Sequence, residues 1–359
     1  MSNASSRTEP DAGPLPATTG AAGWRLILDP LAAPAGAPAV LSDFAHRLAR
    51  LVGPAQAAAV LAPAARRHGL ALLPAEQVAQ ARLLAKRARH HQLAALRLLA
   101  GAGIAGVVLK GFDFAHRLYD DPLDRIGQDL DLLLRPGDIA PALHHLLAAG
   151  WRFGRPVLPA WGSIARASLS PLLSPDGATQ VDLHREADEW PLSRVLPTAQ
   201  LLAAAESFRC EDLTLRAPRA EDSLLLLVSN LGKDKFGPLA ARKLLDAARL
   251  IARDAPDPAR LVGCARQALL ARPLATMSGL LRELGLALPP PWPATPRGSS
   301  FARLLDDQRG LALRAPSGAA LLRREIGLAA HWRVAASRNL QRARGLVRLD
   351  QDRFKSKRT

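Results

Sequence analysis

Cysteine is scarce in this chain, which excludes a cysteine-based metal cluster. Only Cys210 and Cys264 occur among 359 residues, and they stand far apart without the spacing of zinc ligands. A reducing compartment is therefore expected, and the cytoplasm is the expected location.

Long apolar runs and a secretory leader are also lacking. No stretch of about 18 apolar residues is free of charge, so no membrane span is expected. Residues 1–22 combine small residues with Asp and Glu, and they lack the basic start and apolar core of a signal peptide. We therefore expect a soluble protein that begins with a tail of low complexity.

Lysine is rare although the chain is strongly basic. The net charge of +16 arises from 48 basic and 32 acidic residues, yet only seven of the basic residues are lysine. Such an arginine excess fits a GC-rich genome as well as it fits a protein that binds polyanions. The charge favours nucleotides, nucleic acid or acidic membranes as partners. Nucleic acid is possible but not favoured, because no RNA-binding module is recognisable.

The hydrophobic pattern that is present divides the chain into helical flanks and a short central region. Apolar residues follow helical spacing before residue 102 and after residue 217, whereas short β-type runs lie between. The predicted fold class is α+β, with a small mixed β-sheet core flanked by N- and C-terminal helical segments. The expected parts are a disordered tail (1–23), a helical region (24–102), the αβ core (103–216), a second helical region (217–287), a Pro-rich linker (288–317) and a basic helix and tail (318–359).

Three short segments of the core are expected to be strands. Residues 104–109 contain β-branched residues and lead into a Lys-Gly turn. Residues 128–134 form an apolar run that two acids interrupt, and residues 181–184 form a third candidate.

Asp129 and Asp131 are the most informative residues of the chain. Side chains alternate along a strand, so both acids project from one face while Leu130 and Leu132 pack on the other. Two like charges this close repel, and burying them costs several kcal/mol unless something compensates. A divalent cation is the simplest compensation, which makes the pair half of a metal site. The alternative is the polar face of an exposed strand.

Three motifs follow one another in the core: Leu109-Lys110-Gly111, then Arg125-x3-Asp129-Leu130-Asp131, then Val181-Asp182-Leu183-His184. With these motifs the chain resembles the nucleotidyltransferase superfamily that includes DNA polymerase β, and most closely a bacterial branch of uncharacterised nucleotidyltransferases. The likeness covers roughly residues 40–255. It implies the small mixed sheet typical of nucleotidyltransferases.

The resemblance implies that Asp129 and Asp131 bind two Mg²⁺ ions together with the triphosphate of an NTP, with ATP favoured, and that Asp182 supplies the third carboxylate. Two metals can stabilise the attacking and leaving oxygens of an in-line phosphoryl displacement. Oxygen ligands suit Mg²⁺. Asp182 is also a candidate general base.

Four further residues are candidates for nucleotide binding. Lys110 and Gly111 stand where most of the superfamily has Gly-Ser or Gly-Gly; Gly111 lets the backbone approach an anion. Lys110 either contacts the β/γ-phosphates or simply extends its charge into water. Arg125 either touches phosphate or holds the aspartate loop by a salt bridge. His184 shares a face with Asp182. There it either orients a metal ligand, binds the acceptor, or has only a structural role in packing.

The function expected is Mg²⁺-dependent transfer of NMP from an NTP to a hydroxyl of an unidentified small molecule or protein, with release of pyrophosphate. Asn230, where relatives often have His, leaves the acceptor side open. The main alternative is a catalytically silent nucleotide-binding protein with a regulatory or interaction role. A basic helical nucleic-acid binder is a weaker alternative that rests on charge alone.

Overall fold

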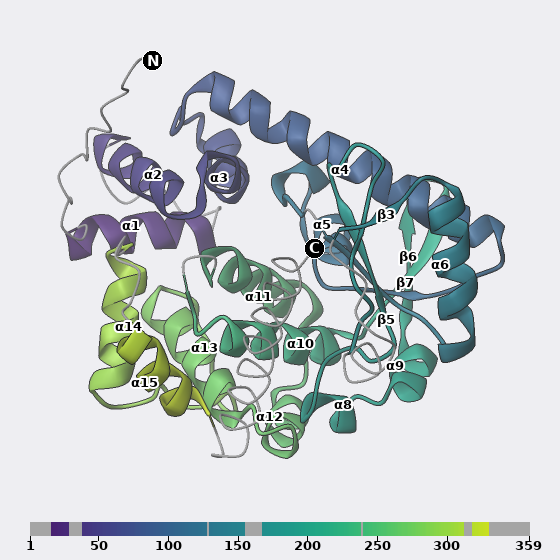
Figure 1. Cartoon of the computed structure of the whole chain (residues 1–359). Coiled ribbons are helices and arrows are strands. Elements are labelled where there is room, and N and C mark those ends of the chain that lie inside the picture. Colours follow the sequence, from purple (N-terminus) through teal and green to yellow (C-terminus); the bar gives the residue numbers. More distant parts are fainter. Residues whose placement is uncertain are drawn as a thin grey trace, which may run out of the picture.

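The computed structural model describes residues 16–28, 38–127, 129–154, 167–237, 240–311 and 318–329. It shows an α+β fold in which helices surround a five-stranded mixed sheet (Figure 1). The helices that precede the sheet are α1 (Ala17–Leu28), α2 (Pro38–Val52), α3 (Pro54–His68) and α4 (Ala75–Gly101). Those between the strands are α5 (Phe112–Leu118), α6 (Ile139–Ala148), α8 (Leu192–Val195) and α9 (Thr198–Ala204). Those that follow are α10 (Ala220–Lys233), α11 (Ala240–Asp254), α12 (Pro258–Gln267), α13 (Ala271–Glu283), α14 (Ser299–Arg309) and α15 (Gly318–Leu328).

The sheet combines parallel and antiparallel pairs. Its order is β1 (Val107–Leu109), β2 (Asp129–Leu133), β5 (Gln180–His184), β4 (Leu172–Leu173) and β3 (Arg152–Phe153). β2 and β5 run parallel, and each other neighbouring pair is antiparallel. A hairpin of β6 (Glu206–Cys210) and β7 (Leu213–Ala217) forms a second sheet beside β1. The three predicted strands are confirmed, and the first begins at Val107 rather than at Ile104.

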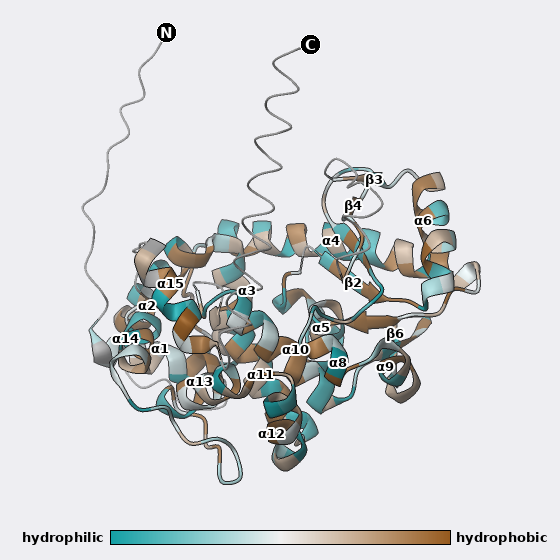
Figure 2. Ribbon diagram, turned by 60° about the horizontal axis from the view of Figure 1, so that its bottom comes forward, coloured by the Kyte–Doolittle hydropathy of each residue, from teal (hydrophilic) through white to brown (hydrophobic). Residues whose placement is uncertain are grey.

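Alternation along β2 and β5 gives the sheet one apolar face and one partly polar face. The apolar face packs against α4 and α6, and its strand residues are Leu130, Leu132, Val181 and Leu183. α4 can cover this face because its buried residues recur every three or four positions. Its ribbon accordingly alternates between teal and brown in Figure 2. The acidic residues of β2 and β5 therefore lie on the opposite face.

The helices at the two ends of the chain share one core with that opposite side of the sheet. Buried side chains of α1–α3 and of α10–α14 form a single hydrophobic cluster that includes Val107 and Leu109. Trp24 of α1 is fully buried, and its indole Nε1 donates to the carbonyl oxygen of Gln308 at 2.7 Å. α1 and α14 thus lie side by side although they are far apart in the sequence (Figure 1).

Two expected boundaries differ from the structure. α1 begins at Ala17, inside the expected tail 1–23, because its apolar residues are buried in the common core. The expected linker 288–317 contains α14, and Leu288, Trp292 and Leu304 are buried in the same core. The prolines lie between α13 and α14, and the shared core shows that they do not separate two bodies. The basic tail beyond residue 329 lies outside the described residues.

None of the described helices is long and apolar enough to cross a membrane.

Replacing Trp24 by alanine is expected to destabilise the protein by about 3–5 kcal/mol, the usual cost of emptying a fully buried tryptophan site. Urea unfolding followed by circular dichroism measures this. Leu83→Ala is the matched control, because Leu83 is 59% exposed and its truncation should change stability by less than about 0.5 kcal/mol. Equal effects of the two changes would show that α1 does not belong to the core.

Candidate active site

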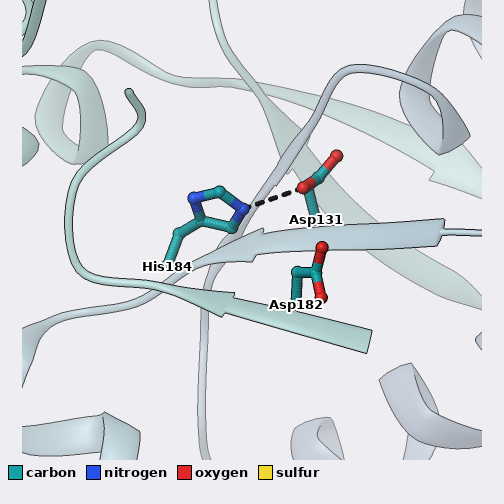
Figure 3. A group of neighbouring side chains, drawn as sticks. All are labelled: Asp131, Asp182 and His184. Atoms are coloured by element: carbon teal, nitrogen blue, oxygen red, sulfur yellow. Dashed lines mark hydrogen bonds and ion pairs between the residues drawn. The ribbon is translucent and has the colours of Figure 1, made fainter. Parts of the chain in front are cut away.

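The register of β2 and β5 brings two of the predicted acids together. Asp131 lies opposite Asp182 on the neighbouring parallel strand. Paired residues of adjacent strands share a face, so both carboxylates project into the same space. His184 projects from this face two residues after Asp182 (Figure 3). The potential ligand atoms of these three residues all lie within 4.8 Å of one another.

Each ring nitrogen of His184 has a hydrogen-bonding partner. Its Nε2 lies 2.8 Å from Oδ1 of Asp131, and its Nδ1 lies 3.1 Å from the carbonyl oxygen of Glu186. A carbonyl oxygen only accepts hydrogen bonds, so Nδ1 carries a proton and donates it. The imidazole ring is therefore fixed in orientation, with Nε2 directed at the carboxylates.

The two carboxylates differ in how their charge is compensated. Burial raises the pKa of Asp131, but the Lys110 ammonium and the hydrogen bond from His184 outweigh it and hold this pKa at about 2. Burial and then the charge of Asp131 raise the pKa of Asp182 to about 6. Within the described part of the chain, the buried Oδ1 of Asp182 has no hydrogen-bond partner. A bound cation would supply the compensation that Asp182 lacks, so these residues fit a metal ion.

Lys110 and Gly111 form the turn from β1 into α5. Both have positive φ, 37° and 51°, and the ψ of −81° at Gly111 completes a conformation that suits glycine alone. The turn places Nζ of Lys110 3.7 Å from Oδ2 of Asp131. Burial lowers the pKa of Lys110, but Asp131 and the nearby carboxylates outweigh it and raise the pKa above its ordinary value. The Lys110 ammonium therefore stays charged beside Asp131.

Asp129 lies outside this group of three. It is half-buried at the start of β2, where its partner in register is Gln180 rather than an acid. It lines a hollow of about 360 Å³ together with polar side chains that include Gln56, Thr179 and Arg242. The structure thus brings Asp131, Asp182, His184 and Lys110 together and places Asp129 at the adjoining hollow.

Arg125 holds the loop before β2 in place. Its guanidinium donates to both carboxylate oxygens of Asp246 on α11, with the shortest bond at 2.9 Å, and both residues are buried. The hydroxyl of Tyr119 donates to the same carboxylate at 2.8 Å. The salt bridge is one of the two roles that the sequence left open for Arg125.

Two acids of this region have roles that sequence reasoning missed. Asp246 occupies a core position of α11, between Leu245 and Ala247, and a carboxylate among core positions is a signal for a buried cationic partner. Asp188 follows β5 in a loop without a motif, is buried, and forms an ion pair with Lys233 of α10. Only the folded chain shows that Asp188 also lies close enough to Lys110 to influence its pKa.

Comparison with protein-family models gives a match that covers most of the chain. Residues 44–285 match a family model described as an uncharacterised nucleotidyltransferase. The matched range begins in α2, ends just after α13 and includes each candidate site residue named above. No curated protein matches the chain.

Asp113 of α5 provides a test of the buried charges next to the site. It is fully buried, and burial raises its pKa to about 7 despite Arg117 at 3.8 Å. Between pH 4 and pH 7 the folded state thus binds more protons at Asp113 than the unfolded state, so this residue lowers stability as the pH rises. Asp113→Asn should equal the wild type near pH 4 and exceed its stability by up to about 4 kcal/mol at pH 8.

Urea unfolding at both pH values measures the difference, and Asp306→Asn is the control because Asp306 is exposed on α14. An advantage of Asp113→Asn that is the same at both pH values would contradict a buried, titrating carboxyl.

Proposed function

The chain belongs to the uncharacterised nucleotidyltransferase family, and from that premise we propose that it transfers NMP from an NTP to a hydroxyl of an acceptor, with release of pyrophosphate. The observation that carries the proposal is the pairing of Asp131 and Asp182 on one face of the sheet, with a buried oxygen of Asp182 that has no hydrogen-bond partner among the described residues. Purely structural acids of this kind would be costly to bury.

The reaction forms one P–O bond and breaks another. The acceptor oxygen attacks the α-phosphorus, the bond from this phosphorus to the β-bridging oxygen breaks, and pyrophosphate leaves with that electron pair. Asp182 accepts the hydroxyl proton, since its carboxylate lies opposite Asp131 on the face where the acceptor would bind. Lys110 neutralises charge on the β- and γ-phosphates, to which its ammonium is a strong point-charge donor.

Asp129, Asp131 and Asp182 would hold divalent ions, with Mg²⁺ as the proposed ion and an NTP, most simply ATP, as the nucleotide. Bound there, such ions neutralise phosphate charge and orient the oxygens for in-line displacement. Gly111 keeps the turn in a positive-φ conformation that suits glycine alone, and its lack of a side chain lets the backbone approach the phosphates.

The hollow beside Asp129 is our candidate for the acceptor pocket. Its volume of about 360 Å³ is within the range of small-molecule sites, and its amide, hydroxyl and guanidinium groups suit a polar ligand. A larger hollow of about 730 Å³ lies between α3 and α4, but none of the candidate site residues lines it. The smaller hollow is favoured because Asp129 lines it.

Transfer of label from an NTP tests the proposal. The protein is incubated with each NTP labelled at the α-phosphate, with Mg²⁺ and with cell extract as the acceptor source. We expect label on an acceptor, and a loss of about a thousandfold in Asp131→Asn and in Asp182→Asn, because each change removes several kcal/mol of charge stabilisation.

Two controls make the result specific. Asp306→Asn should retain full activity, and label at the γ-phosphate should appear only in pyrophosphate. Binding of Mg-NTP without transfer to any acceptor would favour the catalytically silent alternative. Transfer that survives both active-site changes would refute the proposed site.

A further inference from the structure

His184 is part of the only group of three potential metal ligands of this kind among the described residues. The ring is buried, with 7% of its surface exposed, and it lies beside both carboxylates (Figure 3). The reaction proposed above gives it no task. Its placement therefore needs an explanation of its own.

The hydrogen bond to Glu186 determines which ring nitrogen faces the carboxylates. Nδ1 donates to the backbone carbonyl, so Nε2 is the nitrogen that faces Asp131 and donates to it; a metal ion that displaces this proton would bind the lone pair of Nε2. Histidines that bind metals usually donate their other ring N–H in this way to a carbonyl or a carboxylate, which fixes both the tautomer and the ring orientation. His184 thus has the arrangement of a preformed metal ligand.

The spacing of the donor atoms agrees with a shared ion. Nε2 of His184 lies 2.8 Å from Oδ1 of Asp131. Adjacent ligands of a six-coordinate ion with bonds of about 2.1 Å lie roughly 3 Å apart. The buried Oδ1 of Asp182, which has no hydrogen-bond partner in the described part of the chain, offers a third donor.

We propose that His184 binds metal directly, and that Asp131, Asp182 and His184 form a site that prefers a divalent transition-metal ion such as Mn²⁺ to Mg²⁺. An imidazole ligand favours transition metals, whereas Mg²⁺ favours an all-oxygen set. Asp129 and Asp131 would still bind Mg²⁺ with the triphosphate. The inference rests on the proposed function for its choice of a divalent ion, but its test needs neither nucleotide nor acceptor.

The alternative role for His184 is to position Asp131 by a hydrogen bond while carboxylates alone hold the ion. Lys110, at 3.7 Å from Asp131, already provides a positive charge at this carboxylate. The two roles differ in one observable, which is a bond between the metal and nitrogen.

Mn²⁺ bound to the full-length protein allows that bond to be detected. Electron paramagnetic resonance measures the affinity, and electron spin-echo modulation detects a coordinated ¹⁴N nucleus. We expect imidazole modulation in the wild type, replaced by a ¹⁵N pattern when histidine is ¹⁵N-labelled. His184→Gln should abolish the modulation and weaken the binding of Mn²⁺ at least tenfold. The affinity for Mg²⁺, measured by its competition with Mn²⁺, should change less, because glutamine offers an oxygen ligand.

His144→Gln is the matched control, since His144 lies on α6 outside the site, and it should leave signal and affinity unchanged. Circular dichroism confirms that each variant is folded. Bound Mn²⁺ without nitrogen modulation in the wild type would overturn the proposal even if His184→Gln failed to fold. Modulation without any nucleotidyl transfer would leave this inference standing and count against the proposed function alone.

Discussion

The pairing of β2 with β5 in parallel register is the constraint on which the site depends. It places Asp131 opposite Asp182 and brings His184 onto the same face. Asp131 is buried and Asp182 is half-buried, and their carboxylates repel each other, so the fold must supply positive charge close by. Lys110 does so for Asp131, to which His184 adds a hydrogen bond. Asp182 is left with a raised pKa and a buried oxygen without a hydrogen-bond partner among the described residues.

The surrounding helices stabilise the fold against the unfavourable free energy of placing these carboxylates together. One hydrophobic cluster joins the helices before the sheet, the helices after it and the apolar residues of β1. The buried bridge between Arg125 and Asp246 connects the loop before β2 to α11. A buried ion pair contributes little net stability, but losing one partner is expensive, so the bridge fixes the position of the loop. The strand that bears Asp131 is thereby positioned by groups far away in the sequence.

Local sequence patterns predicted the parts of the site that depend on neighbouring residues. Alternation of Asp and Leu from 129 to 132 correctly predicted a strand with one apolar and one acidic face, and the family resemblance is confirmed by the match over residues 44–285. Patterns did not predict the partner of Asp246, the pair of Asp188 with Lys233, or the hydrogen bond from His184 to Asp131. Each of these depends on contacts across the fold. The proline-rich stretch after residue 288 likewise looked like a linker, because composition does not show that Trp292 is buried.

The proposed function requires that the face bearing Asp131 and Asp182 binds a nucleoside triphosphate through divalent metal ions. Calorimetric titration with a non-hydrolysable NTP analogue, with and without divalent metal, tests it most directly. We expect binding that requires the metal and is lost in Asp131→Asn. Equal affinity in the presence of a chelator, or unchanged binding in that variant, would contradict it.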